Sequence, residues 1–344
     1  MKPPKNIILS RTDGIGDMVL MLPMAGVLKA YFPGIKIAVL GKSYTKALVD
    51  ACVWVDEFID ARDFFEKDIT VCGERPEVFI NVRTEKQAAH RAKKLRIPVR
   101  IGTKSRLYHW TTCNRLVKLS RRSSDLHEVQ LNMKLLKPLG IVNKYSTAEL
   151  QEFYGLERLQ PLQENNATLI RDGKYNLIIH PKSQGSSREW PIGHFAELIN
   201  MLDEERFNIF LSGVEKEIPF LEEILSRLTR PVISLGGKMP LDQFLPFIKA
   251  CDGILANATG PVHLGAALGV DAFGLYPPIR PIHPGRWAPL GPGAQVFVHD
   301  KSCKDCRNSK DHCRCMEQIQ PSLIKAALEK AADKKFNTGT NPTT

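Results

Sequence analysis

Short apolar stretches alternate with longer amphipathic stretches twice along this chain, and this alternation constrains the fold more than any other feature. In the first half, "NIILS" and "KIAVLG" each precede a segment of helical character, such as "DMVLMLPMAGVLKAYFP". Strand-then-helix order of this kind builds a parallel sheet covered by helices. The rhythm restarts with "NLIIH", "FNIFLSG", "VISLGG", "GILAN" and "DAFGLY". We therefore predict two doubly wound, Rossmann-like α/β domains that face each other across a cleft.

A polar stretch without strand signals, at about residues 143–173, separates the two halves. It predicts an N-terminal domain over residues 1–150 and a C-terminal domain over residues 172–330. The segment "SSDLHEVQLNMKLLKPLG" is expected to close the first domain as a helix that ends at Gly140. Residues 331–344, which end in "DKKFNTGTNPTT", are expected to form a disordered tail.

The composition is that of an ordinary globular chain, with 43% hydrophobic and 25% charged residues. Its start, "MKPPKNIILSRTDGIG", lacks the apolar run of about 7–15 residues found in signal peptides. No window approaches the roughly 18 apolar residues of a membrane span. The pattern predicts a cytoplasmic protein, whose eight cysteines are expected to be reduced thiols or metal ligands.

A basic band lies between residues 83 and 122, where thirteen Lys and Arg accompany a single acid, Glu85. Such a band fits phosphorylated or carboxylated substrates, an anionic membrane surface or nucleic acid. It also fits a solvated face on helices. Nucleic acid is disfavoured because few aromatic residues, beyond Tyr108 and Trp110, interleave the charges.

The loop after the first strand, "SRTDGIGDMVLMLP", contains glycines and a carboxylate, Asp17. It does not complete the G-x-G-x-x-G dinucleotide fingerprint, because Val19 stands where the third glycine belongs. A carboxylate would also repel a phosphate bound at a helix N-terminus. We therefore interpret Asp17 as an acid that faces the cleft, and we predict no nicotinamide or flavin cofactor.

Two loops of the second half carry groups suited to an anion. The first, "HPKSQGSSREWP", offers Lys182, Ser183 and Arg188, although it also fits a polar loop before a helix that starts with proline. The second, "NATGPVHLGAALG", places Thr259 and Gly260 at a helix N-terminus, a usual place for a diphosphate. His263 either faces the ligand or packs in the core. No D-x-D motif occurs, so a metal-clamped diphosphate is not favoured.

These loops suggest a division of labour between the two domains. The second binds a nucleotide diphosphate, and the first presents a carboxylate. That arrangement suits transfer of a group from a nucleotide leaving group to a hydroxyl, with Asp17 as general base.

Four ordered segments resemble glycosyltransferase family 9, the lipopolysaccharide heptosyltransferases. They are "RTDGIGDMVLMLPMAGVLKAYFPGIKIAVL", "HEVQLNMKLLKPLG", "HPKSQGSSREWPIGHFAELI" and "NATGPVHLGAALG". The resemblance implies a GT-B fold and inverting, metal-independent transfer of heptose from ADP-heptose to a lipopolysaccharide core acceptor. It implies a peripheral position on the cytoplasmic face of the inner membrane.

The same resemblance assigns roles to individual residues. It implies that Asp17 is the catalytic base, that Arg188 replaces a donor-binding lysine, and that Ser183 contacts the donor. The acid that contacts the nucleoside sugar falls on Glu217, with Glu215 as the fallback. The remaining predicted donor-binding residues are Lys182, Thr259, Gly260 and His263. One departure stands out, since Ala258 occupies the place of an aspartate in the family's D-T-G-x-x-H pattern.

Within the basic band, Arg83, Lys86 and Arg106 are predicted to bind the acceptor, and the band as a whole to meet the anionic inner membrane. Two alternatives stay open. The scaffold could use another nucleotide sugar for a different surface glycan, or it could be a degenerate, non-catalytic glycan-binding module.

A cluster of cysteines near the C-terminus, "CKDCRNSKDHCRC", raises the alternative of a zinc site. The spacing is irregular, because one residue separates Cys313 from Cys315. We predict no metal there, with Cys303, Cys306 and His312 as the other ligands if one binds.

Overall fold

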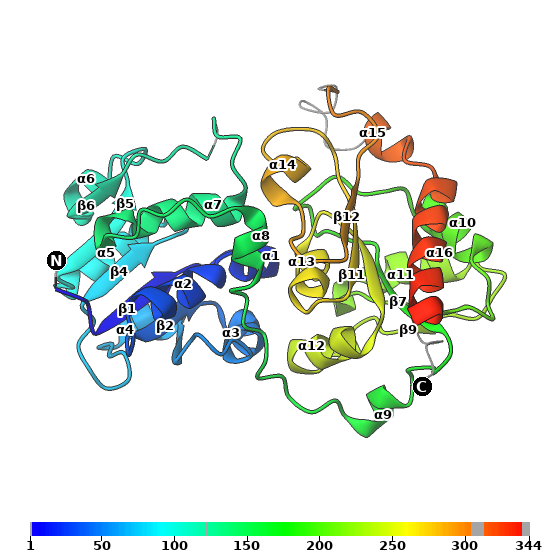
Figure 1. Ribbon diagram of the computed structural model, residues 1–344, viewed down its shortest axis with the longest axis horizontal. Helices are drawn as coiled ribbons and strands as arrows, with labels where there is room; N and C mark the ends of the chain where they lie inside the picture. Colours follow the sequence, from blue (N-terminus) through cyan, green and yellow to red (C-terminus); the bar gives the residue numbers. More distant parts are fainter. Residues whose placement is uncertain (1, 122, 304–312, 339–344) are drawn as a thin grey trace. The chain divides into compact units, whose positions relative to one another are not determined.

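The computed structural model describes residues 2–121, 123–303 and 313–338. The chain divides into two compact units, Met1–Leu159 and Gln160–Thr344 (Figure 1). These limits differ from the predicted domains at residues 151–171. The backbone N–H groups of Glu157 and Arg158 donate to the carbonyl of Ala51, at 3.1 and 3.0 Å, which ties residues 151–159 to the first unit. The N–H of Gln163 donates to Gln243 Oε1 at 2.9 Å, within the second unit.

The first unit is built on a six-stranded, parallel sheet in the order β3-β2-β1-β4-β5-β6. Its strands are β1 (Asn6–Ser10), β2 (Lys36–Gly41), β3 (Glu57–Asp60), β4 (Val78–Asn81), β5 (Val99–Thr103) and β6 (Arg115–Val117). Strands β1 and β4 are buried throughout, as expected for central strands covered on both faces. Strands β5 and β6 lie inside the basic band and were not predicted, so the interpretation of the whole band as a helical face is wrong.

Helices and short turns of helix connect these strands. They are α1 (Ile15–Val19), α2 (Pro23–Tyr31), α3 (Lys46–Asp50), α4 (Ala61–Glu66), α5 (Lys86–Lys94), α6 (His109–Thr112), α7 (Glu128–Met133) and α8 (Thr147–Gln151), with 3₁₀ turns at Ser43–Thr45 and Lys134–Leu139. The single helix expected before residue 33 is two, because Pro23 lacks an amide hydrogen and starts a new helix. Gly140, at φ 92°, ends the last turn as predicted.

The second unit repeats the architecture, with the parallel order β12-β11-β10-β7-β8-β9. Its strands are β7 (Tyr175–His180), β8 (Phe207–Leu211), β9 (Ile233–Ser234), β10 (Gly253–Asn257), β11 (Asp271–Leu275) and β12 (Ala294–Phe297). Its helices are α9 (Glu164–Ala167), α10 (Ile192–Met201), α11 (Ile218–Leu225), α12 (Leu241–Ala250), α13 (Gly260–Ala267), α14 (Pro284–Trp287), α15 (Arg314–Glu317) and α16 (Pro321–Thr338), with a 3₁₀ turn at Glu215–Glu217. Both units therefore confirm the predicted doubly wound α/β class.

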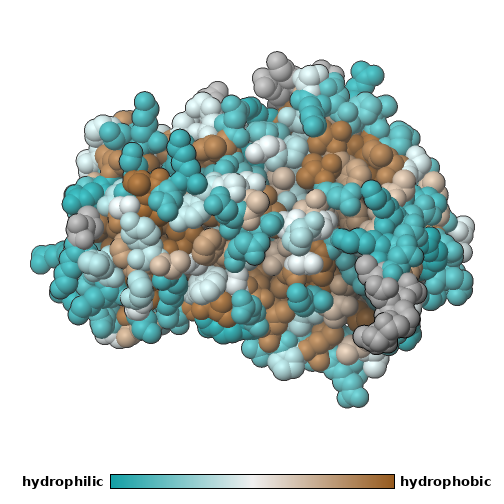
Figure 2. Space-filling view, in the orientation of Figure 1, coloured by the Kyte–Doolittle hydropathy of each residue, from teal (hydrophilic) through white to brown (hydrophobic). Residues whose placement is uncertain are grey.

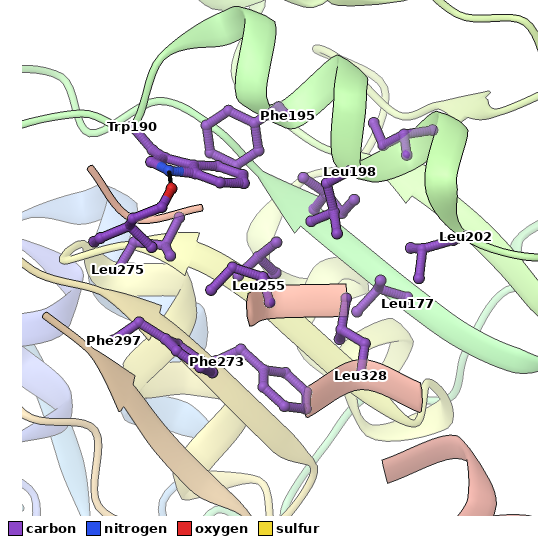
Figure 3. Packing of buried hydrophobic residues seen from close by; sticks show 14 of the residues in the cluster. Leu177, Trp190, Phe195, Leu198, Leu202, Leu255, Phe273, Leu275, Phe297 and Leu328 are labelled. Carbon is purple, nitrogen blue, oxygen red and sulfur yellow. Dashed lines mark hydrogen bonds between the residues drawn. The ribbon is translucent and has the colours of Figure 1, made fainter. Parts of the chain in front are cut away.

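The core of the second unit joins α10 and α16 to the sheet (Figure 3). Trp190 lies at its edge, and its indole N–H donates to the carbonyl of Ile319 at 2.8 Å. Leu328 and Ala332 of α16 are fully buried. The tail predicted to be disordered from residue 331 is therefore wrong for residues 331–338, because an apolar face of α16 packs on this core. Residues 339–344 lie outside the described part of the chain.

Within the described residues, no helix combines the length and the apolar character that crossing a bilayer requires.

Candidate active site

Each sheet has one switch point, where the strand order reverses between its two central strands. The switch point lies between β1 and β4 in the first unit and between β7 and β10 in the second. Ligands of doubly wound sheets bind beyond the carboxyl ends of such strands. The predicted catalytic and donor-binding residues follow β1, β7 and β10, except for Glu217, which follows β8. The topology therefore selects most of the same loops as the sequence motifs.

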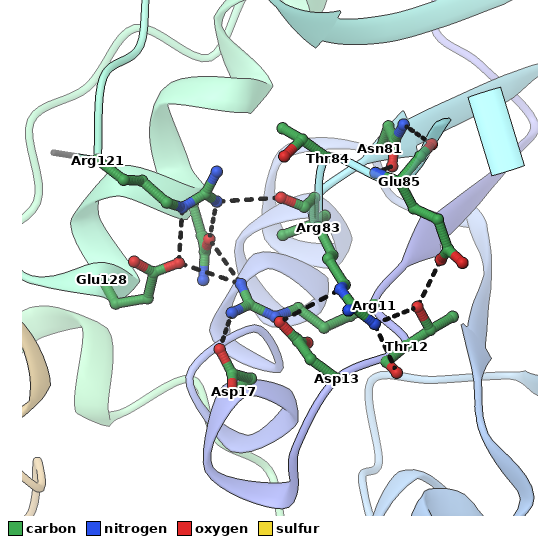
Figure 4. A network of polar contacts seen from close by, with 12 residues as sticks. Arg11, Thr12, Asp13, Asp17, Asn81, Arg83, Thr84, Glu85, Arg121 and Glu128 are labelled. Atoms are coloured by element: carbon green, nitrogen blue, oxygen red, sulfur yellow. Dashed lines mark hydrogen bonds and ion pairs between the residues drawn. The ribbon is translucent and has the colours of Figure 1, made fainter. Parts of the chain in front are cut away.

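Arg11 is the centre of the polar network after β1 (Figure 4). The side chain is buried, and its Nε donates to Asp13 Oδ1 at 2.8 Å. Its terminal nitrogens pair with Asp17 and, at 3.1 Å, with Glu128 Oε1. Burial alone would lower the pKa of Arg11, but the three carboxylates outweigh it and raise the pKa above its ordinary value. Arg11 is therefore a permanent cation that holds Asp17.

Asp17, on α1, combines a fixed position with access to solvent. Its Oδ1 is held by Arg11, while 26% of the side chain stays exposed. Burial raises the pKa of Asp17, and the charge of Asp13 adds to this, although Arg11 opposes the shift. A carboxylate with a raised pKa is a stronger proton acceptor than an ordinary aspartate. These properties suit a general base.

Three residues far along the chain complete this network, and the sequence did not reveal them. Glu128 is fully buried on α7 and also accepts from Arg121 Nε at 2.8 Å. The Asn132 side-chain oxygen accepts from Arg121 at 3.0 Å, and its amide donates to the Leu20 carbonyl at 2.9 Å. Glu128 and Asn132 lie in the segment "HEVQLN", but nothing in its local pattern indicates a contact with Arg11, 117 residues away.

Two of the predicted acceptor-binding cations, Arg83 after β4 and Arg106 after β5, contact the loops that follow β1 and β4. Arg83 Nη1 donates to the Thr12 carbonyl and hydroxyl, at 3.0 and 3.1 Å. Arg106 Nε donates to the Thr84 hydroxyl at 3.2 Å. Lys86 is exposed at the first position of α5. The acceptor-binding role of these cations stays a prediction.

In the second unit, the loop after β7 gathers the groups predicted for anion binding. Ser183 is buried, and both its N–H and its hydroxyl donate to Glu189 Oε1, at 2.7 and 2.8 Å. Lys182 pairs with Glu189 Oε2, and its Nζ lies 3.9 Å from the centre of the Phe220 ring. Arg188 is half-buried beside them in the sequence. Glu189 was not singled out in the sequence, although it stands directly before "WP".

Asn257, the last residue of β10, holds both ends of that loop. Its amide donates to the Pro181 carbonyl at 2.6 Å, and its oxygen accepts from the Trp190 N–H at 2.9 Å. The side chain is fully buried. The loop after β7 is thereby fixed to the strand that leads into Thr259 and α13.

The start of α13 lies directly after this strand. Thr259 is the N-cap, with extended backbone, and Gly260 and Pro261 begin the helix. The first N–H groups of a helix lack partners within it and attract anions. His263 is buried one turn into α13, and its role in donor binding stays a prediction.

A second acid of this unit, Glu217, is buried near the end of β7. Its Oε2 accepts from the Val214 N–H at 2.9 Å, and its Oε1 has no hydrogen-bond partner among the described residues. His180 Nε2 lies 4.0 Å from this carboxylate, and burial lowers the pKa of His180 to about 4, so the imidazole is neutral at pH 7. Glu215, the fallback, is exposed. A buried carboxylate with an unused oxygen suits a ligand hydroxyl, which favours Glu217 over Glu215.

The family model described as glycosyltransferase family 9 (heptosyltransferase) matches residues 70–317. This chain belongs to glycosyltransferase family 9. It is 23% identical over 318 residues to lipooligosaccharide heptosyltransferase 2 of Campylobacter jejuni, a match that covers 90% of this chain and 93% of that protein.

Two solved structures support the fold of this family 9 enzyme. The Escherichia coli ADP-heptose lipopolysaccharide heptosyltransferase II has a TM-score of 0.73 at 20% identity, over 96% of this chain and 99% of that one. The E. coli heptosyltransferase WaaC, solved with ADP, has a TM-score of 0.69 at 17% identity, over 95% and 99%. The predicted GT-B fold and the predicted glycosyltransferase class are confirmed. The alternative of a non-catalytic glycan-binding module loses its support.

The family 9 site departs from the expected pattern at Ala258. No carboxylate stands at that position; the half-buried alanine donates its backbone N–H to the Leu275 carbonyl at 3.0 Å. A smaller, uncharged residue therefore stands where the resemblance implies an aspartate.

The cysteine cluster of this family 9 enzyme lies partly outside the described residues, since Cys306 and His312 belong to the undescribed segment 304–312. Cys313 and Cys315 are buried, and Cys303 is partly buried. Among the residues that the structure describes, no group of His, Cys, Asp and Glu is arranged to hold a metal ion. The zinc alternative stays untested.

Proposed function

We propose that this enzyme transfers heptose from ADP-heptose to a hydroxyl of a lipopolysaccharide core acceptor, with inversion at the anomeric carbon. The observation that carries the proposal is Asp17, a partly exposed carboxylate with a raised pKa, held by Arg11 at the switch point of the first unit. In the second unit, the cations Lys182 and Arg188 follow β7, and the Thr259 hydroxyl and the N-terminus of α13 follow β10. The family and the ADP-bound E. coli structure support the donor class.

The chemistry follows from these groups. Asp17 accepts the proton of the acceptor hydroxyl, whose oxygen attacks the anomeric carbon of the donor sugar. The bond from that carbon to the diphosphate oxygen breaks, and ADP leaves with the electron pair. Lys182, Arg188 and the N-terminus of α13 stabilise the negative charge that develops on the leaving group. Glu217 accepts hydrogen bonds from the nucleoside sugar through its unused oxygen.

Release of ADP is the direct test of this proposal. Purified enzyme, ADP-heptose and heptose-deficient lipopolysaccharide core should release ADP and yield a core that is heavier by one heptose in mass spectrometry. UDP-glucose and GDP-mannose serve as matched donors with the wrong nucleoside. Turnover with either of these, and none with ADP-heptose, would contradict the donor assignment.

A different ADP-sugar is the second candidate, and Ala258 is the observation that favours it. The missing carboxylate removes a contact that the resemblance implies for the donor. A panel of ADP-sugars in the same assay distinguishes these two candidate donors. A higher kcat/KM for another ADP-sugar than for ADP-heptose would identify that sugar as the one transferred.

We also propose that the basic band meets the acceptor and the anionic inner membrane from the cytoplasmic side. Leu107 and Trp110, beside and within α6, are 87% and 60% exposed, and Lys104 and Arg106 are exposed next to them. The indole N–H of Trp110 donates to the Lys104 carbonyl at 3.2 Å, so the aromatic ring and this basic loop are in contact. Figure 2 shows hydrophilic and hydrophobic residues interspersed over the end of the first unit that carries α5 and α6. Exposed tryptophan and leucine among cations are typical of a surface that inserts into anionic lipid.

Vesicle binding tests this surface. The wild type should sediment with vesicles that contain anionic lipid and not with zwitterionic vesicles. The Leu107→Ser, Trp110→Ser double variant should lose most of that binding. Leu323→Ser, at an exposed leucine of α16, is the matched control. Equal binding of the double variant and the control would contradict the proposal.

A further inference from the structure

Glu189 stands out in the loop after β7 because its carboxylate takes up the donors that an anionic ligand would need. We call these donors, the ammonium of Lys182 and the N–H and hydroxyl of Ser183, the anion cradle. All three contact Glu189, the ammonium at Oε2 and both Ser183 groups at Oε1. A cation, a backbone N–H and a hydroxyl on one anion form the donor set of a phosphate site.

Hydrogen bonds and packing hold the loop that carries the anion cradle, so its donors keep a fixed position. Ser183 is buried, and its carbonyl accepts from the N–H and the hydroxyl of Ser186, at 3.0 and 2.7 Å. Asn257 holds the loop at Pro181 and Trp190. Lys182 lies against the Phe220 ring. The donors therefore keep their positions whichever anion they bind.

From this geometry we propose that Glu189 occupies the anion cradle in the free enzyme and is displaced by the diphosphate of the donor. This inference rests on the proposed function, because it takes the cradle as part of the donor site. Two anions cannot both take the same three donors, because each donor position holds one acceptor and the two negative charges would repel each other there. Glu189 therefore lowers the affinity for the donor and keeps the cradle ordered until the donor arrives.

The size of the effect follows from the population of the open cradle. A ligand that binds only the open form loses apparent affinity in proportion to the fraction of molecules that are open. If about one molecule in ten is open, removing the competing charge tightens binding about tenfold. Glu189→Gln is the suitable change, because the amide keeps the size of the side chain and an oxygen that accepts from Ser183.

Calorimetric titration of the full-length enzyme with inorganic pyrophosphate, ADP and adenosine tests the proposal. Glu189→Gln should bind pyrophosphate and ADP about tenfold more tightly than the wild type. Its affinity for adenosine, which has no phosphate, should not change. Glu222→Gln removes the same charge from an exposed position on α11 and should change none of the three affinities.

A second variant shows whether the competition runs through the cradle. In a Lys182→Met background, the cradle has lost its cation, so Glu189→Gln should tighten pyrophosphate binding by much less than in the wild type. Circular dichroism and the unfolding temperature establish that each variant is folded.

The outcomes separate this inference from the proposed function. Weaker or unchanged pyrophosphate binding by Glu189→Gln would overturn the inference, with weaker binding showing that Glu189 organises the cradle instead. If pyrophosphate binding tightens while ADP does not bind either protein, the self-occupied cradle stands and the ADP donor fails.

Discussion

The two switch points sit on sheets of the same strand order but hold opposite kinds of groups. After β1, one buried cation, Arg11, holds three carboxylates of its own chain. After β7, one carboxylate, Glu189, holds a cation and two neutral donors. The same backbone geometry thus presents a carboxylate held by a cation in one unit and a set of hydrogen-bond donors held by a carboxylate in the other. Because the two sheets share one strand order, the side chains of each loop, and not the fold, distinguish the proposed proton transfer from the proposed anion binding.

Loss of the Asp17 carboxylate should have the largest effect, because it removes the proposed base of the first unit. Asp17→Asn keeps the shape but cannot accept the acceptor's proton, so we expect kcat to fall about 10²–10⁴-fold. The ADP dissociation constant should stay unchanged. Steady-state ADP release measures kcat, and calorimetry measures the ADP dissociation constant.

Asp13→Asn is the matched control for Asp17→Asn, because Asp13 also pairs with Arg11. It should reduce kcat far less. In the wild type, kcat should fall as the pH drops through the pKa of Asp17, which lies above the ordinary value for aspartate. Equal losses in the two variants would contradict the assignment of the base.

Substitution of Glu128 tests whether the ion-pair network after β1 stabilises the first unit. Glu128→Gln removes a carboxylate partner from the buried Arg11 and the partly buried Arg121, and breaking a buried pair costs up to about 3–5 kcal/mol. The free energy of unfolding of the first unit, from its urea transition, should fall by that amount. Asp50→Asn, in an exposed pair with Lys46, should change it by less than about 1 kcal/mol. Similar effects of the two changes would show that the network does not hold the unit together.

The buried His180 should make the stability of the second unit depend on pH. The pKa of His180 is about 4 in the folded chain, below its ordinary value of 6.5. Between these pH values the unfolded chain binds a proton that the folded chain does not, so stability falls as the pH drops, by up to about 3 kcal/mol. Unfolding of the second unit at pH 7 and pH 4.5 should show this loss, and His180→Asn should reduce it. An unchanged pH response in the variant would exclude His180 as the cause.

Asn257 should give the smallest of these effects. Asn257→Ala leaves the Pro181 carbonyl and the Trp190 N–H buried without their partner, at a cost of about 1–3 kcal/mol. Part of this loss should appear as weaker ADP binding, because the loop after β7 loses its anchor. Calorimetry measures it, with Asn200→Ala on the exposed side of α10 as control. Unchanged ADP affinity would show that the anchor does not organise the donor site.

Most of the fold was predictable because the apolar runs of central parallel strands are long and uniform. The strands that escaped prediction are β6 and β12, at sheet edges, and β5, which lies next to β6. β6 includes the exposed Arg115, and β5 includes the half-buried Arg100, so neither shows an apolar run. Helix α16 extends past residue 330 because Ala332 packs in the core, a contact that polar neighbours in the sequence conceal.

The candidate site was predictable in its loops and not in its pairings. Asp17, Lys182 and Ser183 follow strands and carry informative side chains, so motif and topology select them. Arg11 contacts Glu128 of α7 across 117 residues of the chain. Asn257 donates its hydrogen bond to the Pro181 carbonyl across 76 residues. No local pattern encodes such contacts.

Hydrogen exchange with and without ADP tests the division between the two units most directly. ADP should slow amide exchange in residues 181–190 and 257–263 of the second unit and leave exchange in residues 11–19 of the first unit unchanged. Protection at residues 11–19 without protection at 181–190 would contradict it, because the nucleotide would then bind beside the carboxylate.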